Sequence, residues 1–390
     1  MKTRPECMPC VLYQALTFGR ATSDDDFSVR KLVGNVLRTL QDTNWSQSPA
    51  ELIERVLEES RETLNAADPM APARAQAREV LSGFVPALRE RLARAEDPLA
   101  FAVTAAAAAN LADEMIFPAF QTEEQLQKEL ERCLAKGFAK GAPSDLAAAL
   151  EGAERVLYLL DNAGEAHVDA LLIEQLAQRG LAVTVAVRGT GLLHDATRAD
   201  AAAAGLEPTP PAPLPSPAAA PPVAEPPAAG PAATGAAPEA DATTTAAEPR
   251  SSSDASTSDA AAPAEPTTAS DASAGDAAPA DASPEAQPAE PAKPVSPVVA
   301  LLELKPGLLA WPSVSRASEV GVALDAADVV IAKGSAYFET FEDETREVIH
   351  LLRAKCRPVA WALEVAPGDL VLLRRSPPPP PEPEPEPPAE

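Results

Sequence analysis

The stretch LYLLDNAGEAHVDALL, residues 157–172, decides the fold because it joins a buried strand to a helix through a short polar turn. The apolar run RVLYLL at 155–160 stops at Asp161 and Asn162, and a helical pattern follows at 166–178. Continuous apolar strands that lead into amphipathic helices are typical of a parallel sheet covered on both faces. This stretch therefore predicts an α/β protein.

The same alternation of strand and helix continues outward from this stretch. It predicts strands at 181–187, 298–304, 327–332, 358–363 and 369–373, and helices at 197–204 and 344–355. Strands of one kind lie on both sides of residues 207–297, so we expect that segment to interrupt a single α/β core.

The first part of the chain shows a helical pattern instead. KLVGNVLRTL, ELIERVLEES and FVPALRERLARA each place apolar residues at i, i+3 and i+4 with charges between them. We predict five regions: a helical N-terminal domain at 1–150, the first part of the α/β core at 151–206, a disordered insert at 207–297, the second part of the core at 298–375, and a disordered tail at 376–390.

The predicted insert consists almost entirely of Ala, Pro, Thr, Ser, Asp and Glu, and it lacks the apolar surface that would offset the entropy of ordering. It has 13 acidic and two basic residues, and the tail adds four acids. These segments account for most of the formal net charge of −26. The remaining mild acidity argues against a nucleic-acid partner.

The location of the protein is also predicted from the sequence. The chain contains no continuous apolar run of the ~20 residues that a membrane span needs. Its first residues, MKTRPECMPC, lack the apolar centre of a signal peptide. We therefore expect a cytoplasmic protein without a membrane partner.

Polar side chains follow three of the predicted strands. Asp161 and Asn162 end the first strand, Asp195 follows the second, and Lys333 with Gly334 ends a later one. The carboxyl ends of parallel strands form the ligand-binding edge of such a sheet. Carboxylate and amide oxygens suit a divalent cation such as Mg or Mn, and the ammonium of Lys333 suits a phosphate.

Simpler explanations exist for each of these groups. An Asp-Asn pair after a strand is common in turns and helix caps, and Asp195 is a good N-cap for the helix that follows. In the functional interpretation, Gly164 would let a ligand approach the N-terminus of the next helix. The occurrence of such groups at three strand ends favours a joint metal and phosphate site.

Cys7 and Cys10 form a CxxC motif, which is typical of half a zinc site or of a redox pair. No second Cys or His pair follows it in the sequence. A zinc or redox protein centred on these two cysteines is therefore an alternative function.

Several stretches together resemble the damage-control phosphatases, a family also known as the ARMT-like metal-binding domain. They are ECMPCVLYQAL near the start, AANLADEMIFPAF at 108–120, LYLLDNAGE at 157–165, VRGTGLLHDAT at 187–197, ADVVIAKGSAYFET at 327–340 and AKCRPVA at 354–360. The resemblance implies a helical N-terminal domain on a Rossmann-like three-layer α/β/α core. It also implies a divalent metal (Mn, Co, Ni or Mg) and a small phosphorylated metabolite as the substrate.

The resemblance also assigns roles to individual residues. It implies Asp161, Asn162 and Asp195 as metal ligands, Asp161, Asp195 and Lys333 as catalytic residues, and Asn110, Asp113, Gly164, Glu165, Lys333, Gly334 and Tyr337 as substrate contacts.

This sequence departs from the family pattern in the stretch after Lys333. Tyr337 stands where the family commonly has Asn, Ala336 replaces a Gly, and His194 replaces an Asn before Asp195. The main prediction is a metal-dependent phosphatase that acts on sugar phosphates or damaged phosphometabolites. A sensor that binds metal and phosphometabolite without turnover is the alternative that these departures leave open.

Overall fold

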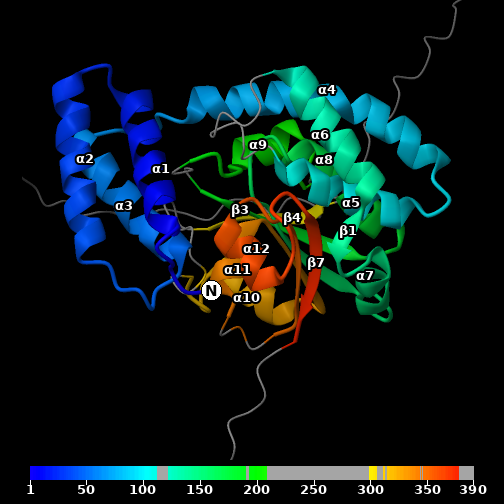
Figure 1. Cartoon of the computed structure of the whole chain (residues 1–390). Helices are drawn as coiled ribbons and strands as arrows, with labels where there is room; N and C mark the ends of the chain where they lie inside the picture. Colours follow the sequence, from blue (N-terminus) through cyan, green and yellow to red (C-terminus); the bar gives the residue numbers. More distant parts are fainter. Residues whose placement is uncertain are drawn as a thin grey trace, which may run out of the picture. The chain divides into compact units, whose positions relative to one another are not determined.

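The computed structural model describes residues 1–111, 122–189, 193–208, 298–304, 311, 314–342, 344 and 346–376 (Figure 1). The helices and strands described below belong to one compact unit, Met1–Pro211 with Pro294–Glu390. Almost all of the predicted insert and tail, and the candidate residue Asp113, lie outside the described residues. The domain limits given above stay predictions.

Three helices at the start of the chain pack around a small core of their own. They are α1 (Cys7–Thr22), α2 (Asp26–Gln41) and α3 (Pro49–Leu64). Asp25 accepts from the first turn of α2, and Ser48 forms a capping box with Glu51 at the start of α3. Val11 and Leu32 are among the buried residues where these helices meet. The predicted helical segments at 31–40 and 51–60 are confirmed.

The remaining helices surround a seven-stranded sheet. They are α4 (Ala71–Arg94), α5 (Pro98–Ala109), α6 (Glu123–Lys136), α7 (Pro143–Ala149), α8 (Ala166–Gln178), α9 (Arg198–Ala203), α10 (Glu319–Ala326), α11 (Ser335–Thr340) and α12 (Arg357–Leu363). The strands are β1 (Phe138–Lys140), β2 (Arg155–Leu159), β3 (Ala182–Arg188), β4 (Val298–Leu304), β5 (Val329–Lys333), β6 (Val348–Arg353) and β7 (Leu370–Arg375). Their order in the sheet is β1-β7-β6-β5-β2-β3-β4.

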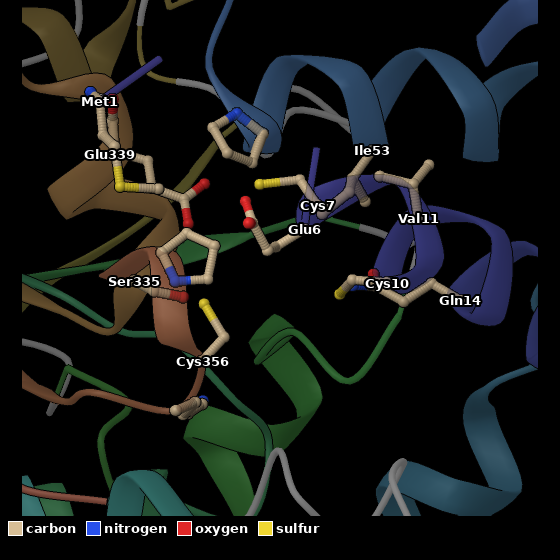
Figure 2. A pocket seen from close by; sticks show the side chains of 13 residues that line it. Met1, Glu6, Cys7, Cys10, Val11, Gln14, Ile53, Ser335, Glu339 and Cys356 are labelled. Carbon is tan, nitrogen blue, oxygen red and sulfur yellow. Dashed lines mark hydrogen bonds between the residues drawn. The ribbon is translucent and has the colours of Figure 1, made fainter. Parts of the chain in front are cut away.

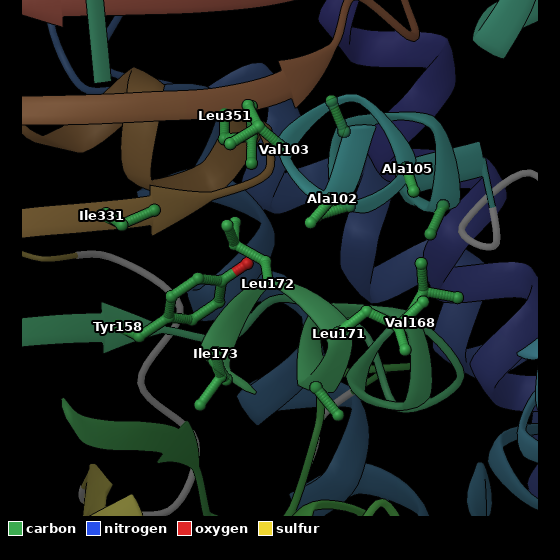
Figure 3. Packing of buried hydrophobic residues seen from close by; sticks show 14 of the residues in the cluster. Ala102, Val103, Ala105, Tyr158, Val168, Leu171, Leu172, Ile173, Ile331 and Leu351 are labelled. Carbon is green, nitrogen blue, oxygen red and sulfur yellow. The ribbon is translucent and has the colours of Figure 1, made fainter. Parts of the chain in front are cut away.

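Successive residues along the strands pack on opposite faces of the sheet. Tyr158 and Ile331 belong to the core cluster on one face, where α5 and α8 pack (Figure 3). Leu157 and Val330, their neighbours in sequence, belong to the cluster that includes residues of α10 and α11. The predicted three-layer α/β/α arrangement is confirmed.

Two predicted elements at the end of the core are wrong. Residues 344–355 were expected to be a helix, but Val348–Arg353 form strand β6. Residues 358–363 were expected to be a strand, but they belong to helix α12. Short apolar runs fit either state, and burial on both sides of β6 hides the alternation that would identify a strand. Pro358 in the first turn of α12 is a helix-start signal that the apolar run obscured.

The sheet is also not purely parallel. Strand β7 pairs antiparallel with β6, and the short strand β1 pairs parallel with β7 at the edge. Strands β2, β3, β4, β5 and β6 are parallel to one another, so their carboxyl ends share one edge. Within the part of the chain that the structure describes, no helix has the length and apolarity needed to cross a bilayer.

Candidate metal and phosphate site

The loops after β2 and β3 are joined by main-chain contacts that bring three predicted ligands together. Asn162 and Asp195 form an isolated antiparallel β-bridge. The Ala196 N–H donates to the carbonyl oxygen of Asp161 at 2.8 Å. The side chains of Asp161, Asn162 and Asp195 are all buried, with residue exposures of 5%, 5% and 4%. The chain thus places two carboxylates and one amide at the carboxyl ends of neighbouring strands.

Arg188 joins the two carboxylates and was missed by the sequence analysis. Its Nη1 donates to Oδ1 of Asp161 at 3.0 Å and to Oδ1 of Asp195 at 2.6 Å. The guanidinium lies over the ring of Tyr337, 4.4 Å from its centroid. Burial alone would lower the pKa of Arg188, but Tyr337, Asp195 and Asp161 raise it, so the side chain stays charged. The position of Arg188, a cationic residue at the end of an apolar strand, is the sequence feature that could have predicted its place in the site.

A buried amide and carboxylate network fixes the side chain of Asp161. The amide groups of Asn110 and Asn162 each donate to Oδ2 of Asp161 at 2.9 Å. The same two amides donate to Oε1 of Glu165, at 2.7 and 2.5 Å. Asn110 and Glu165 are fully buried, and the N–H of Arg353 donates to Oδ1 of Asn110 at 3.2 Å. These two residues therefore orient a predicted ligand.

Lys333 is fully buried beneath this network. Its ammonium donates to the carbonyl oxygen of Ala106, to Oε2 of Glu165 and to Oδ1 of Asp169, each at 2.8 Å. An ammonium has three N–H groups, so every donor of Lys333 is already bonded to protein. The phosphate contact that the sequence predicted for Lys333 has no donor left in this geometry.

Asp169 extends the network on helix α8 and was also missed. Tyr158 donates its hydroxyl to Oδ1 of Asp169 at 2.8 Å. Burial raises the pKa of Asp169 to about 6, although Lys333 opposes the shift. The pKa of Lys333 stays above its ordinary value, because the attraction of Asp169 and Glu165 exceeds the effect of its burial. Lys333 and Asp169 therefore form a buried ion pair next to the predicted metal ligands.

Glycine is required at two candidate positions, 334 and 164, for different structural reasons. Gly334 has φ +83° and ψ 178°, and a Cβ there would lie 1.9 Å from Oδ2 of Asp161. A Cβ on Gly164 would instead lie 2.6 Å from the carbonyl oxygen of Ala77 on α4. Gly334 thus makes room for a predicted ligand, whereas close helix packing explains Gly164.

Tyr337 is part of an aromatic cluster beneath Arg188. Its ring meets those of Trp311 and Phe341 edge to face, with centroids 6.4 and 5.7 Å apart. Burial raises the pKa of Tyr337 to about 12, so the phenol stays protonated. In this chain the residue that departs from the family pattern supports the guanidinium with its ring.

A second missed cation, Lys355, lies at the edge of the site. Its Nζ is 3.8 Å from Oδ2 of Asp161, and its side chain is 11% exposed. Lys355 also lines a cavity of about 390 Å³ between the helices α1 and α3 and the segments around α11 and α12 (Figure 2). Lys355 thus links the cavity to Asp161, although the predicted ligands Asp161, Asn162 and Asp195 do not themselves line it.

The side-chain oxygens of Asp161, Asn162 and Asp195 are the kind of ligand that a hard divalent cation prefers. Oδ1 of Asp161 and Oδ1 of Asp195 converge on a single cationic nitrogen of Arg188. Among the described residues no three His, Cys, Asp or Glu side chains are arranged to hold a metal, so a cation here would need an amide oxygen as well. Asn162 uses its N–H groups on carboxylates, so its oxygen is the atom that it can offer.

Residues 3–209 and 301–371 match the damage-control phosphatase ARMT1-like domain family. This match covers well over half of the chain, and the chain therefore belongs to that family. The resemblance that the sequence motifs predicted is confirmed.

Relatives and a solved structure agree with this assignment. The chain is 30% identical over 203 residues to a damage-control phosphatase of Archaeoglobus fulgidus. The aligned region covers 52% of this chain and 69% of that protein. It is 27% identical over 209 residues to the damage-control phosphatase PH1575 of Pyrococcus horikoshii, covering 53% and 71%. A crystal structure of a DUF89 family protein from Pyrococcus horikoshii aligns with a TM-score of 0.65 at 21% identity, covering 96% of this chain and 99% of that one. The structural likeness supports the fold, and the family supports a phosphatase.

Proposed function

We propose that this protein is a divalent-metal-dependent phosphatase that hydrolyses phosphate monoesters of small metabolites, including sugar phosphates or damaged phosphometabolites. The observation that supports this most strongly is the convergence of two buried carboxylates, from Asp161 and Asp195, at the carboxyl ends of parallel strands. A cavity large enough for a small ligand is lined by Lys355, which lies 3.8 Å from Oδ2 of Asp161.

Asp161, Asn162 and Asp195 would hold the cation, which can be Mn, Co, Ni or Mg. When bound, such a metal supplies charge neutralisation at a phosphoryl oxygen and can orient an attacking water. Asp161 is better suited to be a ligand than a nucleophile. Its oxygens already accept hydrogen bonds from Asn110, Asn162 and Arg188, and these bonds stabilise the carboxylate and fix its direction.

Two cations of the chain would bind the phosphate. Lys355 lies between Asp161 and the cavity, and its ammonium can donate to phosphate oxygens. Arg188 has a planar guanidinium that suits a phosphate as well as the two carboxylates that it now contacts. Lys333 would act as a positioning residue, because its hydrogen bond to Glu165 keeps the amides of Asn110 and Asn162 directed at Asp161.

Hydrolysis of an aryl phosphate by the full chain, with each of Mn, Co, Ni and Mg, tests this function. We expect turnover that depends on the metal and is lost in Asp195→Asn. Asp325→Asn is the control, because Asp325 forms an exposed ion pair with Arg316. Wild-type protein that binds metal and phosphate without hydrolysing any ester would contradict the proposal and leave the sensor as the function.

The cysteine-centred alternative has a separate test. Cys7 and Cys10 lie in one cavity with Cys356, yet among the described residues they belong to no group arranged to hold a metal. Metal analysis with thiol titration distinguishes the two functions. One equivalent of zinc that blocks the thiols would favour the zinc protein.

A further inference from the structure

The segment at 193–200, called the Asp195 segment below, contacts the loop after β2 on its inner side. The Ala163 N–H donates to the carbonyl oxygen of His194, and the Ala196 N–H donates to that of Asp161, each at 2.8 Å. These bonds bring Asp195 beside Asp161. They fix a single line of contact between two loops, so the position of Asp195 also depends on what holds the outer side of the segment.

The outer side is held by Arg74, a residue of helix α4 that is only 4% exposed. Its Nη1 donates to the carbonyl oxygen of Leu193 at 3.2 Å, and its Nε lies 4.0 Å from Oδ2 of Asp200. Its Nη2 donates to Oδ2 of Asp68 at 2.5 Å. A planar guanidinium presents donors in several fixed directions. One side chain of α4 therefore contacts both ends of the Asp195 segment.

The far end of the segment forms the first turn of α9. Asp200 is fully buried, and its Oδ2 accepts from the N–H and the hydroxyl of Thr197, at 2.7 and 2.6 Å. Its Oδ1 accepts from Nη1 of Arg78, a second residue of α4. A buried carboxylate that loses a charged partner is strongly destabilised. The end of the segment is thus tied to α4 by charge.

The near end of the segment is anchored by a side chain as well. Leu193 packs against a small apolar cluster that includes Phe18 of α1, Leu57 of α3 and Met70 next to the start of α4. Its carbonyl oxygen accepts from Arg74. Both groups of Leu193 therefore contact helices that precede the sheet in sequence, and none of these contacts involves a predicted metal ligand.

We propose that Arg74 is a positioning residue for the metal site, because it holds both ends of the Asp195 segment to α4 and so sets the place of Asp195 relative to Asp161. The inference deepens the proposed metal-dependent function and rests on it. Two carboxylates share a cation well only if their separation is fixed in advance. Loss of a group that orients a metal ligand typically weakens metal binding roughly 10- to 100-fold.

Titration of the full chain with Mn, at a temperature where circular dichroism shows every variant to be folded, gives the first measurement. Arg74→Met should weaken Mn binding roughly tenfold or more. Arg74→Lys keeps the charge but replaces the planar fork with a single ammonium, so we expect an intermediate affinity. Arg89→Met is the matched control, because Arg89 also joins α4 to the core, through Glu174 of α8. Its Mn affinity should equal that of wild type.

Hydrogen–deuterium exchange of the metal-free full chain gives a second measurement that needs no metal. Amides in a peptide covering the Asp195 segment should exchange roughly tenfold faster in Arg74→Met than in wild type, because local opening becomes easier. Arg74→Lys should again be intermediate. A peptide covering β3 should keep its wild-type rate in both variants, and Arg89→Met should leave the Asp195 segment protected.

The two measurements separate this inference from the proposed function. Unchanged exchange of the Asp195 segment in both Arg74 variants overturns the inference, and so does an unchanged Mn affinity when wild type binds Mn. An equal loss of Mn affinity in Arg89→Met also overturns it, because packing of α4 in general would then set the site. Faster exchange in the Arg74 variants of a protein that binds no Mn would support the positioning of Asp195 and contradict the metal-dependent function. If Arg74→Met does not fold, Arg74→Lys decides both measurements.

Discussion

Gly334 lies against Asp161 so closely that a Cβ on the glycine would be 1.9 Å from Oδ2 of the carboxylate. Its backbone, at φ +83° and ψ 178°, is also in a region that only glycine adopts readily. We expect Gly334→Ala to lower the free energy of unfolding by at least about 1–3 kcal/mol and to displace Asp161. Metal-dependent phosphatase activity should be lost, and urea unfolding measures the stability change.

Gly152→Ala is the control for backbone strain. Gly152 has φ +74°, but a Cβ there would meet no atom within 4 Å. This variant should lose stability through its backbone alone and keep its metal-dependent activity. Equal loss of activity in both variants would show that the contact with Asp161 is not what matters.

The positions of the predicted ligands follow from one rule, that the carboxyl ends of parallel strands share one edge of the sheet. The same rule explains which residues of the site the sequence predicts and which it does not. Asp161, Asn162 and Asp195 are near one another because the strands before them are neighbours with a common direction. The rule also holds for Arg188, the last residue of β3, although the motifs point only to the acidic and amide side chains and to one lysine. Lys355 follows the misassigned strand β6, so its place beside the site was hidden.

The role of Lys333 could not be predicted from its position alone. Along β5, Lys333 shares a face with Val329 and Ile331, the face that packs against α8. Whether a terminal lysine faces the ligand or a neighbouring helix depends on register and on acidic residues elsewhere in the chain. The resemblance implies a substrate contact for Glu165 and gives Asp169 no role, so the sequence motifs do not predict the buried ion pair.

Lys333→Met should destabilise the protein strongly. It would leave the buried carboxylates of Glu165 and Asp169 without their cation, which typically costs about 3–5 kcal/mol. Chemical denaturation measures this loss. Lys140→Met, which removes a more exposed ion pair with Glu364, should change stability by less than about 1 kcal/mol. A Lys333→Met protein of normal stability that binds phosphate poorly would restore the phosphate contact predicted from the sequence.

Glu339 should make stability depend on pH. Burial raises its pKa from 4.5 to about 7, so the folded protein binds a proton at Glu339 more tightly than the unfolded chain does. The favourable contribution is complete below pH 4.5 and is lost as pH rises toward 7. Glu339→Gln should therefore be more stable than wild type at pH 8, by about 1–3 kcal/mol, and similar to it near pH 4.5.

Thermal unfolding across this pH range measures the effect of Glu339. Glu62→Gln, an exposed substitution on α3, should leave the pH profile unchanged. If the Glu339→Gln profile is parallel to that of wild type between pH 4.5 and 8, Glu339 does not titrate in this range.

The last prediction concerns Arg188 and the proposed cation. Its guanidinium now neutralises Asp161 and Asp195, the two carboxylates that would hold the metal. In metal-free protein, Arg188→Met should lower the free energy of unfolding by about 3–5 kcal/mol, because two buried charges lose their partner. Added Mn should then restore stability, since a ligand that binds only the folded state stabilises it.

The size of the Mn-induced shift in Tm decides whether Arg188 and the metal use the same carboxylates. We expect a larger shift in Arg188→Met than in wild type, because the cation no longer has to compete with the guanidinium for Asp161 and Asp195. Asp195→Asn should show no shift, because a charged ligand is missing. Equal shifts in wild type and Arg188→Met would mean that the guanidinium and the cation do not compete. A full shift in Asp195→Asn would mean that the ligand assignment is wrong.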